Sequence, residues 1–275
     1  MSQQYAPQGF SLLPAGVKNL LIINVLVYLA SLVLHMRGIV DLEDSLALYF
    51  IGSDHFRPWQ YVTYMFMHGS FEHLLFNMFA LWMFGYILEN YWGTMRFLVF
   101  YFVCGIGAGL VHSMVIWITS APVLADINAF AANPSPDALV LLYGDHFKGI
   151  INPAWVSEIC NAWRVNAGGA DFATIAVDAF TNAYRERIIG IPTVGASGAI
   201  YGILLAFGMM FPNEQIYLYC LVPIKAKWFV IGYAVVELVT GILGTNDGIA
   251  HFAHLGGMLF GLLLILYWRK NRYRQ

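Results

Sequence analysis

Six apolar segments recur along the chain, and each is close to the length that a helix needs to cross a lipid bilayer. A spanning helix needs about 20 apolar residues, because the hydrocarbon core is about 30 Å thick and an α-helix rises about 1.5 Å per residue. Backbone polar groups cannot bind water at that depth, which favours a helix that satisfies its own. The segments cover residues 17–34, 73–88, 97–118, 194–211, 228–243 and 249–268. This pattern predicts an all-α polytopic membrane protein with six spanning helices.

The composition agrees with that class of protein. Hydrophobic residues make up 59% of the 275 residues and charged residues only 11%, with a mean hydropathy of +0.65. Such a surface is stable where lipid covers it, so the bilayer is an expected partner. The chain has no basic tract interleaved with aromatic residues, which argues against nucleic acid as a partner.

Basic residues predict the orientation of the chain. Six crossings place both termini on one side of the membrane, and basic residues cluster on that side, which indicates the cytoplasm. A short N-terminal tail, 1–16, and a basic C-terminal tail, 269–275, are therefore expected to be cytoplasmic. The lack of long cytosolic segments favours a bacterial plasma membrane. The basic residues on this side are Lys18, Arg96, Lys225, Lys227, Arg269, Lys270, Arg272 and Arg274.

The connection between the third and fourth segments, residues 119–193, is the most polar part of the chain. We expect it to be a long non-cytoplasmic insertion in a single membrane domain that covers residues 1–275. Pro and Gly punctuate it at 133–137 and 168–169, which predicts turns there. Apolar residues at helical spacing between Phe172 and Ala183 predict an amphipathic helix, which packs on its own bundle or lies on the membrane surface.

Ser197 lies in a run of small residues, Gly195 to Gly202, at the start of the fourth segment. Taken alone, this pattern indicates a surface where another helix packs closely, with Ser197 and Gly198 as ordinary members. A second polar residue changes that interpretation. His254 stands just before Gly256 and Gly257 in the sixth segment, where an ionisable group is costly and therefore a candidate for function.

Depth brings Ser197 and His254 together. Both segments are predicted to enter from the non-cytoplasmic side, so both side chains lie about 5 to 10 Å below that surface. Gly198 opposite Gly257 would let the two backbones approach closely enough for a Ser–His hydrogen bond. The alternative for His254 is an interfacial histidine bonded to a backbone carbonyl.

The second segment adds two hydrogen-bond donors at the same depth. His73 and Asn77 are four residues apart and therefore share one helix face. An imidazole and an amide aimed at one point suit an oxyanion hole. Taken singly, His73 is better explained as a capping or interfacial histidine, and Asn77 as a helix–helix hydrogen bond.

These motifs resemble the rhomboid family of intramembrane serine proteases. The resemblance rests on residues 195–198, on Ala253 and His254 followed by Gly257 and Gly261, and on residues 68–77. It implies a Ser–His dyad without an acidic third member, in which Ser197 is the nucleophile and His254 the general base. It also implies that His73, Asn77 and the Ser197 backbone N–H bind the oxyanion, and that Tyr201 packs against His254. Glu89 and Arg96, on either side of Gly93, resemble the family's structural connection between the second and third helices.

The expected function is therefore an intramembrane serine endopeptidase that hydrolyses peptide bonds in or near transmembrane segments of membrane proteins. We expect no cofactor and no metal, because His-Glu-x-x-His is absent and His251 and His254 lack an evident third ligand. An aspartyl protease needs two intramembrane acids, whereas the only acid in a predicted apolar core is Glu237. The main alternative is a non-catalytic rhomboid-like protein that binds transmembrane segments, although such a protein would be expected to lose Ser197 or His254.

Overall fold

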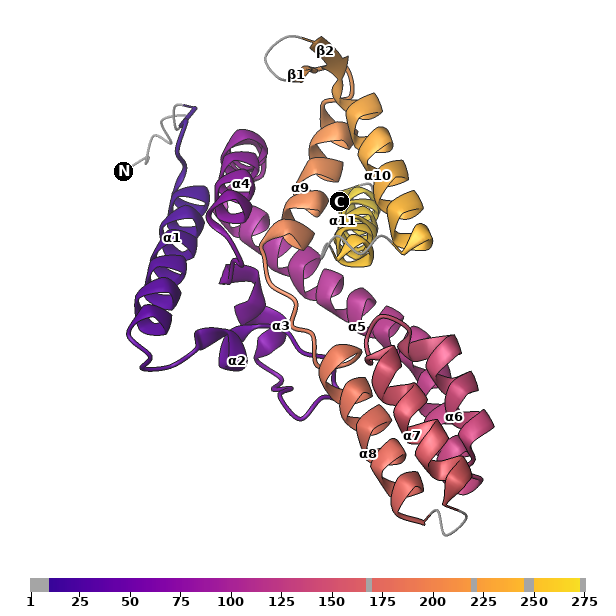
Figure 1. The fold of residues 1–275 in the computed structure, drawn as a ribbon. Coiled ribbons are helices and arrows are strands. Elements are labelled where there is room, and N and C mark those ends of the chain that lie inside the picture. The colour runs from indigo at the N-terminus through magenta and orange to yellow at the C-terminus, as the bar shows by residue number, and fades with distance from the viewer. Residues whose placement is uncertain (1–9, 167–169, 219–221, 245–249, 273–275) are drawn as a thin grey trace, which may run out of the picture. The chain divides into compact units, whose positions relative to one another are not determined.

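The computed structural model describes residues 10–166, 170–218, 222–244 and 250–272, which are mostly helical (Figure 1). The chain divides into two compact units. Unit 1 consists of residues 1–48, 58–112 and 193–275, and unit 2 of residues 49–57 and 113–192. The sequence predicted a single membrane domain over residues 1–275, and that stays a prediction.

Five of the described helices are long and apolar enough to cross a membrane. They correspond to five of the six predicted segments, with ends that differ by a few residues except in α5. The sixth, α9 (Ser197–Met210), has only 14 residues and is about 21 Å long, shorter than the hydrocarbon core. Six crossings are therefore not confirmed. The five long helices are α1 (Ala15–Met36), α4 (Phe71–Trp92), α5 (Thr94–Ala132), α10 (Ala226–Leu243) and α11 (His251–Arg272).

Within unit 1, α9 contacts α4, α10 and α11, and Figure 1 shows α9 between α4 and α10.

Short elements join the helices of unit 1. Strands β1 (Gln215–Leu218) and β2 (Val222–Lys225) form an antiparallel hairpin in which Gln215 pairs with Lys225. The remaining short elements of this unit are α2 (Leu42–Leu46), α3 (Gln60–Thr63) and a 3₁₀ turn, η1 (Tyr64–Phe66).

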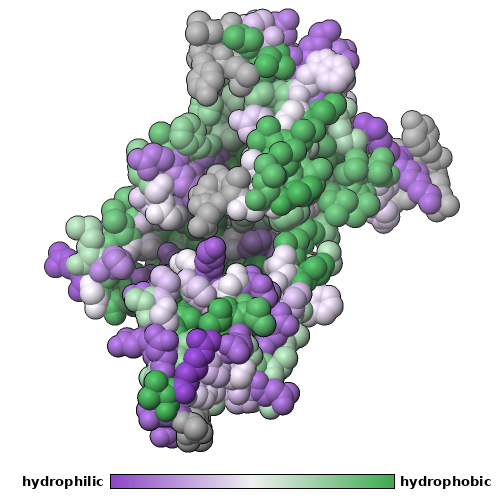
Figure 2. All heavy atoms as spheres, turned by 45° about the vertical axis from the view of Figure 1, so that its right-hand side comes forward, coloured by the Kyte–Doolittle hydropathy of each residue, from purple (hydrophilic) through white to green (hydrophobic). Residues whose placement is uncertain are grey.

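The outer surface of unit 1 is apolar. Large side chains on α1 and α10 are exposed, among them Leu26, Val33, Ile231, Val235 and Leu243. Figure 2, in which α10 comes toward the viewer, shows a broad hydrophobic area in its upper part. Soluble proteins rarely expose such patches, so this surface fits contact with lipid.

Unit 2 is a helical bundle with its own hydrophobic core. The second half of α5 packs there with α6 (Pro136–Leu142), η2 (Tyr143–Phe147), α7 (Pro153–Val165) and α8 (Ala170–Arg187). Phe147 and Phe180 lie at the centre of this core, edge to face at 4.8 Å. The predicted amphipathic helix is thus α8, and its apolar face packs in unit 2 itself.

The third predicted segment ends at residue 118, whereas α5 continues to Ala132 through Pro122. The non-cytoplasmic insertion at 119–193 stays a prediction. Val123, Ile127 and Phe130 recur at helical spacing and are buried in the core of unit 2. That burial keeps the segment helical, although Pro122 has no backbone N–H to donate within the helix. The turn predicted at 133–137 is confirmed, since Ser135 caps α6 by accepting the Ala138 N–H. The glycine pair 168–169 lies outside the described residues.

The sixth predicted segment ends at residue 268, whereas α11 continues to Arg272. The cytoplasmic tail at 269–275 stays a prediction. No helix-breaking residue follows Trp268, and basic residues are favourable at a helix C-terminus. At the other end, the predicted tail 1–16 overlaps α1, which begins at Ala15.

A buried carboxylate joins the start of α1 to α4 and α5. Pro14 precedes α1 and offers no side-chain cap, but Glu89 accepts the backbone N–H groups of Gly16 and Val17, each at 2.7 Å. It also accepts the Thr94 hydroxyl at 2.6 Å. The negative charge favours the positive end of the α1 dipole. Glu89, expected in the connection between α4 and α5, is thus also the N-terminal cap of α1.

Helices α9 and α11 contact each other through the backbone atoms of glycine residues. A methyl group on Gly257 would overlap the carbonyl oxygen of Gly198, and one on Gly202 would lie 3.0 Å from the Gly257 carbonyl oxygen. No residue larger than glycine fits these positions without moving a helix. The predicted glycine contact between the two segments is therefore present.

Replacing Glu89 with Ala should lower the free energy of unfolding by about 2 kcal/mol or more, because two buried N–H groups lose their acceptor. Denaturant unfolding in detergent micelles measures this change. Glu214→Ala, which removes an exposed carboxylate, is the matched control and should leave the stability unchanged.

Gly257→Ala should destabilise the protein by about 1 to 3 kcal/mol, since the added methyl overpacks the contact between α9 and α11. Gly232→Ala on α10 is the control, because a methyl there meets no atom within 4 Å. Thermal unfolding compares the two variants. Equal melting temperatures would contradict the close packing.

Candidate active site

Ser197 and His254 form a hydrogen bond in the structure. Ser197 is the first residue of α9, and His254 is the fourth residue of α11. Nε2 of His254 lies 2.8 Å from Oγ of Ser197. His254 is only 8% exposed, whereas Ser197 is partly exposed. This geometry matches a nucleophile beside its base.

The chain leading to Ser197 is held by backbone hydrogen bonds. Thr193 exchanges two of them with Leu48, at 2.8 and 2.9 Å, and Gly195 donates its N–H to the Tyr64 carbonyl at 2.9 Å. Gly195 has a φ of +126°, in the region that favours glycine. These contacts orient the first turn of α9 and hence the serine side chain.

Tyr201 stacks on the histidine. It lies one turn after Ser197, and its ring centroid is 4.2 Å from that of His254, with only 6° between the planes. A flat ring on one face restricts rotation of the imidazole, so Tyr201 helps to keep Nε2 directed at the serine.

His73 borders the same small space as Ser197. A methyl group on Gly195 would lie 2.8 Å from Nε2 of His73 and 3.6 Å from Oγ of Ser197. Asn77, one turn further along α4, is 6% exposed, and its Nδ2 atom has no hydrogen-bond partner in the described part of the chain. A buried amide donor left unpaired is costly and calls for a functional explanation.

His68 is a further buried imidazole to which the sequence interpretation gave no role. It is 7% exposed and lies edge to face with His73, 5.1 Å between ring centroids. Burial, together with the neighbouring His73, lowers the pKa of His68 to about 4. The ring is therefore neutral at physiological pH. Its position at the start of the motif at 68–77 was the only signal in the sequence.

Glu237 lies next to His254, the partner of Ser197, and is the residue whose importance the sequence least revealed. It comes from α10 and is 6% exposed. Its carboxylate contacts Tyr201, His251 and His254. The signal available beforehand was an acid in an otherwise apolar segment.

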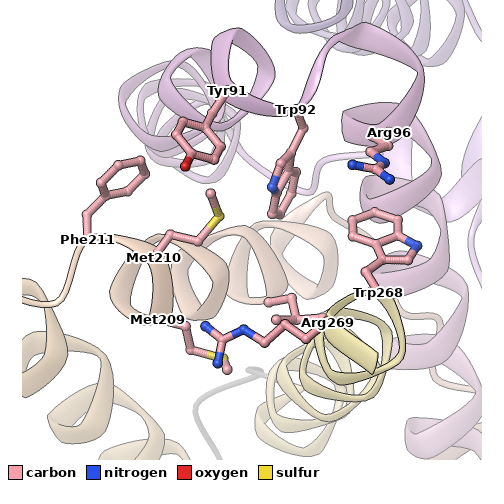
Figure 3. Close-up of a pocket in the computed structure, with 9 residues that line it drawn as sticks. Tyr91, Trp92, Arg96, Met209, Met210, Phe211, Trp268 and Arg269 are labelled. Atoms are coloured by element: carbon pink, nitrogen blue, oxygen red, sulfur yellow. The ribbon is translucent and has the colours of Figure 1, made fainter. Parts of the chain in front are cut away.

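A pocket of about 250 Å³ lies at the far end of α9 (Figure 3). Met210, the last residue of α9, is 13 residues beyond Ser197, which places the pocket about 20 Å from the serine. Trp268 lies on one side with Arg96 above its ring, 5.5 Å from the centroid. The lining has no serine, histidine or acid, so this pocket does not contain the groups of a hydrolytic site. Its lining residues are Tyr91, Trp92, Arg96, Met209, Met210, Phe211, Ile265, Trp268 and Arg269.

Among the described residues, no group of three or more His, Cys, Asp or Glu side chains is arranged to hold a metal ion.

Three curated proteins resemble the chain. Rhomboid-like protein 11, chloroplastic, of Arabidopsis thaliana is 35% identical over 37% of this chain and 34% of its own length. An uncharacterized mitochondrial rhomboid protein of Schizosaccharomyces pombe is 26% identical over 77% of this chain and 50% of its own. Rhomboid protein 1, mitochondrial, of Saccharomyces cerevisiae is 32% identical over 33% of this chain and 26% of its own.

The matches cover half or less of each relative's length. All three names place the relatives in organelles, so the expectation of a bacterial plasma membrane gains no support from them. The model of the Rhomboid domain matches residues 55–123 and 164–271, which is more than half of the chain. With these matches and its apolar helices, the chain is an integral multi-pass membrane protein that belongs to the rhomboid family.

Proposed function

We propose that this rhomboid family member is an intramembrane serine endopeptidase, with Ser197 as the nucleophile and His254 as the general base. The observation that carries the proposal is the 2.8 Å separation between Ser197 Oγ and His254 Nε2. A serine hydroxyl is a poor nucleophile until a base accepts its proton, and this contact supplies the base.

The reaction then proceeds in two halves. Oγ of Ser197 attacks the scissile carbonyl carbon while Nε2 of His254 takes the hydroxyl proton, and His254 returns that proton to the leaving amine. Water hydrolyses the resulting ester with His254 again as base. Nε2 must be unprotonated at the start, so the ring proton of the neutral imidazole must sit on Nδ1.

Three donors are available for the oxyanion. The Ser197 backbone N–H lies at the start of α9, where helical N–H groups lack an intrahelical acceptor. Asn77 supplies an unpaired Nδ2 donor, and His73 lies across the same space. In such a buried site, each donor directed at the developing charge is worth about 10²- to 10³-fold in rate. Gly195 leaves the room that the carbonyl oxygen needs.

The substrate that fits this site is a transmembrane segment of another protein. Ser197 lies within an apolar bundle whose outer surface suits lipid, so a membrane protein meets it from the bilayer. A hydrogen-bonded helix shields its peptide bonds, and the segment must therefore unwind locally before attack. We place both termini on the cytoplasmic side, from the distribution of Lys and Arg.

Ser197→Ala and His254→Ala should each reduce cleavage by at least about 10³-fold, since nucleophile and base act as a unit. The assay uses proteoliposomes with a fluorescent transmembrane substrate. Ser157→Ala, which changes an exposed serine in unit 2, is the control.

Full cleavage by either variant would overturn the dyad. Labelling by a serine-reactive phosphonate should occur in the wild type and be lost in Ser197→Ala. A wild type that neither cleaves nor labels, but still binds the segment, would favour the non-catalytic alternative.

The double variant His73→Ala/Asn77→Ala should lower kcat by at least about 10²- to 10³-fold, the loss expected for one donor, with little change in KM, because these donors act on the oxyanion rather than on the bound substrate. Asn213→Ala, an exposed amide, is the matched control. A rise in KM at constant kcat would assign the two residues to substrate binding instead.

A further inference from the structure

Glu237 is a buried acid in the middle of an apolar helix. It occupies α10, whose other described residues around it are mostly apolar, and it is 6% exposed. A carboxylate at such depth costs several kcal/mol unless donors surround it. Its partners therefore indicate why it is there.

Both oxygens of this carboxylate contact donors from the two helices of the catalytic pair. Oε1 accepts the Tyr201 hydroxyl from α9. Oε2 lies 2.7 Å from Nδ1 of His251 and 3.1 Å from Nδ1 of His254, both on α11. One side chain of α10 thus joins the helix of the nucleophile to the helix of the base.

His254 lies between Ser197 and Glu237. Its Nε2 atom faces the serine hydroxyl and its Nδ1 atom faces the carboxylate. The 3.1 Å separation is that of an ion pair, but Nδ1 does not meet the direction of a hydrogen bond. Hydrogen bonds between catalytic groups often align only when a substrate is bound. A carboxylate beside Nδ1 favours the tautomer that carries its proton there and leaves Nε2 free.

We propose that Glu237 is a positioning residue of this site, which holds His254 in the tautomer that accepts the serine proton and stabilises the imidazolium formed during attack. The inference rests on the proposed protease function and adds an acid to the dyad that the family resemblance implies. No bond to Glu237 is made or broken, because the proton passes only between Ser197, His254 and the leaving amine.

The charges of the groups around His254 support this role for Glu237. Further titratable groups near His254 are His73 from α4, His112 from α5 and Tyr201 from α9, with His251 one turn away on α11. None of these is an anion at neutral pH. Among these described groups, only Glu237 can offset the positive charge that His254 acquires in the transition state.

Tyr201 extends the same effect. Its hydroxyl donates to Glu237 while its ring stacks on His254, so the carboxylate also fixes the ring that restricts the imidazole. A role limited to anchoring α10 would need only the contacts to Tyr201 and His251.

The test is Glu237→Gln, assayed in proteoliposomes with a fluorescent transmembrane substrate. The amide oxygen still accepts from Tyr201, but the amide nitrogen donates to Nδ1 and so selects the tautomer with its proton on Nε2. We expect kcat to fall by up to about 10⁴-fold with KM unchanged, by analogy with the loss when a triad aspartate becomes asparagine.

Two further variants separate positioning from packing. Glu237→Asp keeps the charge and should recover part of kcat. Thr240→Val removes a hydroxyl 3.1 Å from Nδ1 of His251, one turn along α10, and should keep wild-type kcat. A wild-type kcat in Glu237→Gln would overturn the inference and leave the protease function intact. A loss of kcat that Thr240→Val shares would reduce Glu237 to an anchor of α10.

A readout independent of cleavage is the ¹⁵N spectrum of histidine-labelled protein, with His254 assigned by comparison with His254→Gln. The wild type should carry the His254 proton on Nδ1, even if the protein proves to have no protease activity. Finding the proton on Nε2 in the wild type would overturn the proposal. This measurement also stands if Glu237→Gln does not fold.

Discussion

The contact between α9 and α11 is the constraint on which the site depends. Gly198 and Gly257 meet through backbone atoms alone, at a separation that leaves no room for a Cβ. Only at that separation does the fourth residue of one helix reach the first residue of the other, with Nε2 and Oγ 2.8 Å apart. Ser197 would have no base within reach if a larger side chain separated these helices. Gly198 and Gly257 therefore determine the distance between serine and histidine, although neither residue takes part in the reaction.

Two buried carboxylates in unit 1 show the same physical rule with different results. Glu89 is paired with backbone N–H groups at the start of α1, which makes it a cap. Glu237 is paired with a phenol and two imidazoles, which makes it part of the environment of His254. Each is tolerated because donors replace the water that burial removes. What each does follows from the donors around it.

Much of the fold could be predicted, because a bilayer demands apolar runs of a certain length. The segments at 17–34, 73–88, 228–243 and 249–268 all correspond to helices of the structure, with ends a few residues apart. The prediction failed where tertiary contacts replace lipid. Beyond residue 118, α5 stays helical because Val123, Ile127 and Phe130 are buried in unit 2, and a search for bilayer-length runs has no means to detect that core. For α9 the difference has the opposite sign, because the apolar segment at 194–211 is longer than the helix, Ser197–Met210.

The sequence by itself determined which residues are candidates for chemistry. Ser197, His254, His73 and Asn77 stand out because polar groups are rare and costly in apolar segments, and equal depth along three segments brings them to one level. Depth, however, gives only one coordinate of a side chain. The tertiary structure decided the others: the stacking of Tyr201 on His254, the unpaired amide of Asn77, and the place of Glu237 behind the imidazole. These depend on how helices rotate and pack against one another, which the backbone contacts of Gly198 and Gly257 fix and a linear pattern does not contain.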